Sequence, residues 1–181
     1  MFPMTAIIRA ARPSDLDELV EMRSLLWPDG PREEHRRETE TFLAGAPVCT
    51  TPHTVFVAES VALTAAPGSG ESHPADEAVT GRNSATGPVL AAFLEVDLRS
   101  HADGCDPLHP VGFIEGWFVR ETSRKRGIGG QLVRAAEDWA RAQGCREMAS
   151  DTWIDEQVSE RAHQALGFEV VDRCIHFRKS L

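Results

Sequence analysis

One stretch constrains the fold of this 181-residue chain more than any other: residues 123–144, "SRKRGIGGQLVRAAEDWARAQG". Apolar side chains recur there at helical spacing, which predicts an amphipathic helix that ends at Gly144. The apolar face consists of Ile128, Leu132, Ala136, Trp139 and Ala140. Glycines and basic residues stand directly before it, at the helix end that has unpaired backbone N–H groups and the positive pole of the dipole. The stretch therefore predicts a site for an anion such as a phosphate or pyrophosphate.

Two familiar phosphate-binding patterns are excluded. A P-loop requires GxxxxGK[ST], which the chain lacks, and a GxGxxG dinucleotide fingerprint would require glycine where the chain has Leu132. What remains is a pattern of one arginine and two glycines, R-x-x-G-x-G, with further basic residues and a third glycine beside it. Its residues are Arg124, Lys125, Arg126, Gly127, Gly129 and Gly130. Taken alone, this pattern leaves open a plain glycine-rich turn with a solvated basic run.

The rest of the chain predicts a mixed α+β domain with a sheet of six to seven strands and about four helices. Helices are expected over 16–27, 31–45 and 155–167, besides the one described above. Strands are expected over 7–10, 53–60, 89–100, 111–120 and 145–153, with the last two strands inside 168–180. Residues 64–88 have little apolar content and predict a flexible loop inserted into a single domain spanning 1–181.

Charge and cysteine content narrow the partners and the compartment. The net charge of −9 argues against nucleic acid and suits a cationic ligand. No apolar run is long enough to span a membrane, and the N-terminus resembles no secretion signal. The cysteines, which form no CxxC pair, predict free thiols in the cytoplasm and no metal site. They are Cys49, Cys105, Cys145 and Cys174.

The R-x-x-G-x-G pattern between a strand and a helix resembles the acyl-CoA-binding signature of the GNAT N-acetyltransferases. The sequence "LGF" at 166–168 and the N-terminal "IIRAARPSDLDELVEMR" resemble other segments of that superfamily in the same order. The resemblance implies the GNAT fold, a mostly antiparallel sheet splayed between its fourth and fifth strands, where acetyl-CoA inserts. It also implies that the glycine-rich segment holds the CoA pyrophosphate. The pantetheine arm is then held by the backbone of Trp117, Phe118 and Val119, whose side chains are equally consistent with ordinary core.

Further segments resemble one group within this superfamily, the aminoglycoside 6′-N-acetyltransferases. They are "LLWPDG", "PVGFIEGWFV", "ASD" at 149–151 and the spaced set Ser159, His163, Leu166, Gly167 and Phe168. This resemblance implies direct acetyl transfer from acetyl-CoA to the 6′-amine of a cationic aminosugar antibiotic, in an enzyme that is a homodimer like many relatives. Transfer to another small amine or a protein N-terminus, and a non-catalytic acyl-CoA sensor, remain alternatives.

Two carboxylates are candidates for the acceptor site. Glu115 is the odd residue in an apolar strand, and simple alternation would place Phe113, Glu115 and Trp117 on one face. A carboxylate among apolar neighbours is costly unless it is paired, so Glu115 is either a buried salt bridge or a ligand and base for the substrate amine. Asp151 ends the next strand and resembles the second substrate carboxylate, with a turn or N-cap role as the alternative.

Four further candidates depend on the resemblance. His163 stands where many of these transferases have a tyrosine that protonates the departing thiolate, and this chain has no tyrosine. The alternatives are a hydrogen bond to the CoA sulfur or a plain surface histidine. Trp27 and His101 match positions of an aromatic near the sugar, although Trp27 also suits a core. Asp172 matches a third substrate carboxylate, and a solvated turn charge is its alternative.

Overall fold

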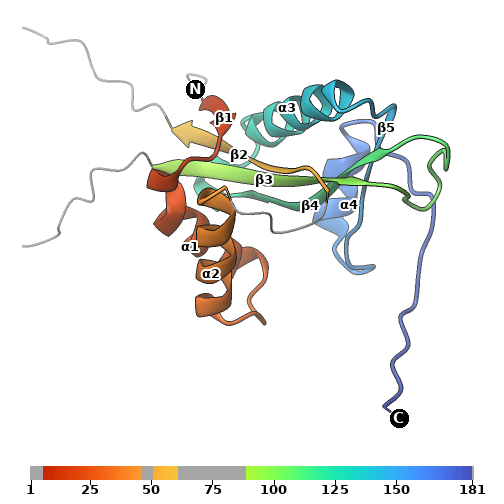
Figure 1. Ribbon diagram of the computed structural model, residues 1–181, viewed down its shortest axis with the longest axis horizontal. Helices are drawn as coiled ribbons and strands as arrows, with labels where there is room; N and C mark the ends of the chain where they lie inside the picture. The colour runs from red at the N-terminus through yellow and green to blue at the C-terminus, as the bar shows by residue number, and fades with distance from the viewer. Residues whose placement is uncertain (1–5, 46–50, 61–88, 181) are drawn as a thin grey trace, which may run out of the picture.

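A computed structural model describes residues 6–45, 51–60 and 89–180. Its five strands form one sheet in chain order (Figure 1). The first three pairs of neighbours are antiparallel and the last pair is parallel, so the predicted mixed, mostly antiparallel sheet is confirmed. The strands are β1 (Ala6–Ala10), β2 (His53–Ser60), β3 (Leu90–Arg99), β4 (Val111–Val119) and β5 (Glu147–Ser150).

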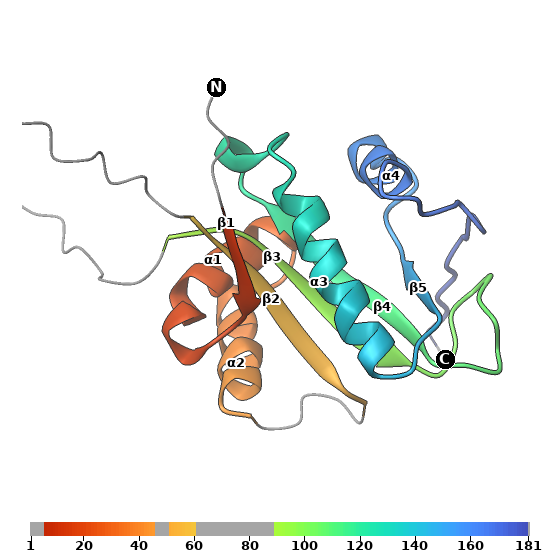
Figure 2. The same ribbon diagram turned by 90° about the horizontal axis from the view of Figure 1, so that it is seen from above.

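Helices cover both faces of the sheet. Two of them, α1 (Leu16–Leu26) and α2 (Arg32–Leu43), lie on one face, and α3 (Ile128–Ala142) lies on the other (Figures 1 and 2). The short α4 (Gln157–Gln164) lies beside β5 at the end of the sheet farthest from β1. Single 3-10 turns, Pro13–Asp15 and Glu121–Ser123, precede α1 and the loop that leads into α3.

The core consists of two apolar layers, one on each side of β3. Leu94 and Val96 pack with Ile128 and other residues of α3, whereas Phe93 packs with Leu19 of α1. Phe93 and Leu94, which are successive residues of β3, lie in different layers, as a pleated strand requires. Each fully buried side chain of this size contributes about 1.5–3 kcal/mol relative to exposure, so the two layers together fix the strand that borders the functional region.

The predicted last two strands are not formed. Residues 168–180 have no regular secondary structure and are largely exposed, and the sheet has five strands where six to seven were expected. An alternating apolar segment forms a strand only if a neighbouring strand accepts and donates its backbone hydrogen bonds. Among the described residues, β5 pairs only with β4. The insertion predicted at 64–88 lies outside the described residues. No helix in the described part of the chain is long and apolar enough to cross a membrane.

Candidate functional site

The fourth and fifth strands separate part-way along their length. Their parallel pairing runs from Val111 opposite Glu147 to Ile114 opposite Ser150, where β5 ends. Beyond that point β4 continues to Val119, and no described strand pairs with the edge of residues 115–119 that faces away from β3 (Figure 2). The predicted splay is thus confirmed. It leaves backbone N–H and C=O groups available to an extended ligand.

Glu115 is the extra residue of a β-bulge. Val96 of β3 pairs with Ile114 and Glu95 pairs with Gly116, so Glu115 has no partner of its own. The bulge resets the alternation of β4, because Ile114 and Trp117 both pack on the α3 layer although they are three positions apart. The expectation that Phe113, Glu115 and Trp117 share one face is therefore wrong.

The side chain of Glu115 is held by Arg99, the last residue of β3. The Arg99 Nε donates to Oε1 at 2.9 Å, and its Nη2 donates to Oε1 at 2.6 Å and Oε2 at 2.8 Å. Burial raises the pKa of Glu115, Arg99 opposes this, and the charges of Asp97 and Asp151 push the pKa further upward. The salt-bridge alternative for Glu115 is thus present, and Asp151 lies near enough to act on it electrostatically.

Trp27 lies next to Gly116, the residue that follows Glu115. It ends α1 and packs on Gly116, where an added Cβ would lie 2.6 Å from the indole ring. The ring also lies 6.3 Å from that of Phe93, centroid to centroid. Trp27 is therefore part of the core and also a neighbour of the residue that follows Glu115.

His101 and Asp172 are not drawn into this cluster. The His101 side chain is 63% exposed and lies 3.7 Å from Asp103 of its own loop. Asp172 is exposed, and its Oδ1 accepts a 2.6 Å bond from the backbone N–H of Arg173. No hydrogen bond or ion pair given by the described residues links either of them to Glu115. The two segments are neighbours, since a Cβ on Gly104 would lie 2.6 Å from Val171.

The N-terminus of α3 has the features of an anion site. Gly127 precedes the helix with φ 77°, in the left-handed region that favours glycine, and no side chain caps the helix. The first intrahelical bond runs from the N–H of Gln131 to the carbonyl of Gly127 at 3.1 Å, so the amides before it lie at the helix end that lacks intrahelical acceptors. Arg124 is tied to the end of β4 through a 3.0 Å bond from Nε to the Val119 carbonyl. This chemistry fits the pyrophosphate of CoA.

Close packing connects this anion site to β4. An added Cβ on Gly129 would lie 2.7 Å from the ring of Trp117. The side chain of Trp117 thus lies in the α3 layer, while Phe118 packs on the other layer with its ring 6.2 Å from Phe93. Both side chains are partly buried and pack against the core, while the backbone of this segment forms the open edge of β4.

His163 lies at the inner end of the splay. Its Nδ1 is 2.9 Å from the carbonyl of Ser159, and its Nε2 is 3.0 Å from the hydroxyl of Ser150, the last paired residue of β5. A carbonyl only accepts, so Nδ1 carries the proton, and Nε2 lies within hydrogen-bond distance of the Ser150 hydroxyl. The ring also makes edge contacts with Trp117 and Phe168, with centroids 5.2 and 5.3 Å away. His163 is therefore a partly buried, hydrogen-bonded side chain next to the end of β5.

Comparison with known proteins identifies the family. The profile described as "Acetyltransferase (GNAT) family" matches residues 67–168. The chain is 35% identical over 175 residues to the aminoglycoside N(6')-acetyltransferase type 1 of Klebsiella aerogenes, covering 97% of each protein. It is 34% identical to the Serratia marcescens protein of the same name, covering 92% of this chain and 94% of that one. The chain belongs to the GNAT acetyltransferase family.

A solved structure confirms the GNAT fold of this chain. AAC(6')-Iy in complex with the bisubstrate analogue CoA-S-monomethyl-acetylneamine has a TM-score of 0.72 and 31% identity, with coverage of 98% of this chain and 99% of that one. Its CoA complex likewise has a TM-score of 0.72 and 30% identity.

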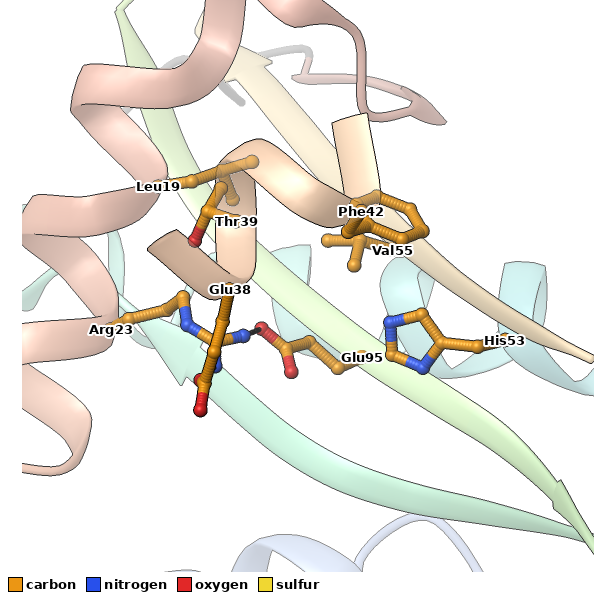
Figure 3. A pocket seen from close by; sticks show the side chains of 8 residues that line it. All are labelled: Leu19, Arg23, Glu38, Thr39, Phe42, His53, Val55 and Glu95. Atoms are coloured by element: carbon orange, nitrogen blue, oxygen red, sulfur yellow. Dashed lines mark hydrogen bonds and ion pairs between the residues drawn. The ribbon is translucent and has the colours of Figure 1, made fainter. Parts of the chain in front are cut away.

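The chain also contains a cluster of charged residues that the sequence analysis did not identify as candidates. A cavity of about 70 Å³ lies between α1, α2 and the sheet (Figure 3). Buried Glu95 forms an ion pair there with Arg23, which also lies 2.7 Å from Glu38. The cavity is far below the roughly 300–1,000 Å³ typical of ligand pockets. The available signal was Glu95 itself, a charge inside an apolar strand.

Proposed function

We propose that this GNAT enzyme transfers the acetyl group of acetyl-CoA to the 6′-amino group of aminoglycoside antibiotics and thereby confers resistance. The single domain would span residues 1–181. The observation that carries the proposal is the position of Glu115, an ionisable carboxyl group at the mouth of the open β4 edge. Relatives named for this activity, 35% and 34% identical along nearly the whole chain, support it.

The donor site in this proposal combines the α3 N-terminus with β4. The amides after Gly127, together with Arg124, Lys125 and Arg126, hold the pyrophosphate, and Gly129 and Gly130 let it approach the backbone. The backbone of residues 117–119 pairs with the pantetheine arm along the open edge. Acetyl-CoA supplies the activated acetyl thioester, and the chemistry requires no metal.

The acceptor site combines carboxylates with an aromatic side chain. Glu115 and Asp151 bind ammonium groups of the aminosugar, and Glu115 receives, through water, the proton that leaves the attacking amine. Trp27 lies beneath the sugar, and His101 and Asp172 extend the site at its rim. In its cationic form His163 carries a proton on Nε2, next to Ser150. This proton neutralises the departing sulfur.

The test is a CoA-release assay with kanamycin-type aminoglycosides, polyamines and peptides. Glu115→Gln and Asp151→Asn should each lower kcat/KM by about 100-fold or more on an aminoglycoside, the size of a general base contribution. Asp138→Asn, on the exposed face of α3, is the matched control and should turn over like wild type. If no aminoglycoside gives CoA release, the proposed substrate class is rejected. Wild-type turnover in both carboxylate variants would reject the roles assigned to Glu115 and Asp151.

We also infer a homodimer. Apolar side chains lie exposed beyond β5, among them Trp153 at 77%, Ile175 at 74% and Phe177 at 93%. Exposed apolar surface of this kind is typical of a protein interface. Ile175 and Phe177 lie in the same segment as Asp172, residues 168–180. Light scattering after gel filtration should give about twice the 19.9 kDa chain mass, and Phe177→Ser with Ile175→Ser should shift the mass to the monomer. A monomeric wild type would refute the inference.

We place the enzyme in the cytoplasm. The cysteines among the described residues, Cys105, Cys145 and Cys174, are free thiols, as a reducing compartment favours. Fractionation of cells that produce a tagged chain tests this assignment. Recovery of the tagged chain in the periplasmic fraction would contradict it.

A further inference from the structure

Arg99 makes the most specific contact to Glu115. The fork of its guanidinium spans both carboxylate oxygens, with three N–O distances between 2.6 and 2.9 Å. The side chains are only partly exposed, 41% for Arg99 and 28% for Glu115. A bidentate pair of this kind fixes direction as well as charge, which a lysine would not do.

The guanidinium is itself anchored. Its central carbon lies 3.4 Å from the ring centroid of Phe113, and Phe113 is only 6% exposed. The backbone of Arg99 is held in the sheet opposite Val111. Rigid contacts therefore lead from a buried ring, through Arg99, to the carboxylate.

Glu115 needs such support because it is the bulge residue. It has no cross-strand partner on β3, so the ladder that fixes its neighbours does not fix its side chain. A carboxylate has about four acceptor positions, and Arg99 supplies three contacts, so a position remains for a substrate amine or a water. The pair can therefore persist while Glu115 works on the acceptor.

We propose that Arg99 is a positioning residue for acetyl transfer, which aims the carboxylate of Glu115 at the acceptor amine and keeps it ionised. The proposal rests on the role proposed above for Glu115. No sequence pattern and no resemblance assigned a role to Arg99. It acts through Glu115 and need not touch the substrate.

The charges around Glu115 determine the sign of the effect. Asp97 on β3 and Asp151 after β5 are both acidic and raise its pKa together with burial, while Arg99 lowers it. On the α1 side, the neighbouring Glu95 is already paired with Arg23, and Asp97 is paired with His53. Without Arg99 the pKa of Glu115 rises, so the base becomes protonated at a higher pH. The acid limb of kcat/KM should then move to higher pH.

The test compares Arg99→Gln, which removes charge and fork, with Arg99→Lys, which removes only the fork. Arg9→Gln is the matched control, because Arg9 forms the same kind of fork with Asp15 at 2.7 and 2.9 Å near the opposite edge of the sheet. Each variant is assayed with kanamycin from mildly acidic to mildly alkaline pH, with Glu115→Gln in parallel. Carbon-13 NMR of the glutamate carboxyls, assigned with Glu115→Gln, reads the same titration without turnover.

Arg99→Gln should lower kcat roughly 10- to 100-fold, the effect of a misplaced catalytic group, and shift both the acid limb and the Glu115 resonance to higher pH. Arg99→Lys should lower kcat with the limb close to its wild-type position. Arg9→Gln should change stability alone, and the KM for acetyl-CoA should stay constant throughout.

The outcomes separate the two proposals. Full activity in Glu115→Gln overturns the role of Glu115 and this inference with it. Suppose that Glu115→Gln is inactive and that Arg99→Gln is folded. If the acid limb of kcat/KM in Arg99→Gln then stays at its wild-type pH, this inference alone is overturned. If Arg99→Gln does not fold, wild-type kcat in Arg99→Lys overturns the inference.

Discussion

Replacing Arg23 by methionine should destabilise the fold more at alkaline than at acidic pH. Arg23 extends from α1 across the cavity to Glu95 on β3, with Glu38 of α2 on its other side (Figure 3). The side chains of the central pair are 14% and 6% exposed, so water screens their attraction little. Methionine keeps most of the buried stem of Arg23 but leaves Glu95 without its cation.

The magnitude follows from the burial of Glu95. Removing one partner of a buried pair costs about 3–5 kcal/mol, because the remaining charge is uncompensated. Burial raises the pKa of Glu95, and Arg23 counters this shift. The folded state therefore binds the Glu95 proton more tightly than the unfolded chain does, and stability falls as pH rises between the unfolded and folded pKa values. Without Arg23 the folded pKa rises further, so the loss grows with pH.

Urea unfolding at about pH 5 and about pH 8 measures the difference. We expect Arg23→Met to approach the full 3–5 kcal/mol penalty at the higher pH and a clearly smaller one at the lower pH. The double variant Arg23→Met, Glu95→Met should recover most of the loss and be insensitive to this change of pH. Arg141→Met, which breaks only exposed pairs, is the control and should have little effect. Equal penalties at both pH values, or no recovery in the double variant, would refute the reasoning.

Substitutions of three glycines test the packing around β4 and α3. Gly129→Ala would bring a Cβ to 2.7 Å from Trp117 and should reduce stability by about 1–3 kcal/mol and weaken CoA binding in calorimetric titrations. Gly127→Ala meets no neighbour but must adopt φ 77°, so it should cost about 1–2 kcal/mol in urea unfolding without disturbing the core. Gly116→Ala would displace the ring of Trp27 and should raise the KM for the aminoglycoside while the KM for acetyl-CoA stays constant. An unchanged acceptor KM would show that Trp27 has no part in acceptor binding.

Local patterns were sufficient to predict the helices and the described strands. The apolar spacing of residues 128–140 and the glycine at 144 defined α3, and β2 spans the predicted 53–60. The prediction of two strands within residues 168–180 was wrong because a strand also needs a neighbouring strand edge to pair with. Apolar alternation within one segment does not show whether such an edge is available. The resemblance supplied the position of the splay, which no local pattern indicates.

The charged side-chain pairs depend on register and were not predictable from spacing. Arg23 and Glu95 are 72 positions apart in the chain, and Arg99 meets Glu115 only because β3 and β4 pair in one particular register. Simple alternation also placed Glu115 wrongly relative to Trp117, since a single unpaired residue inverts the phase of the strand beyond it. The charged residues in apolar strands were visible in the sequence, but their partners were not.

The bulge links the two halves of the site. Pairing between β4 and β5 ends at Ile114, the residue directly before the bulge residue Glu115. A bulge bends its strand and increases the local twist, and the pairing of β4 with β5 ends directly before this one. No described strand pairs with the outer edge of the segment beyond it, and Trp117 of that segment packs against Gly129 at the start of α3. The proposed donor groove and the proposed acceptor carboxylate therefore meet at one irregularity in one strand.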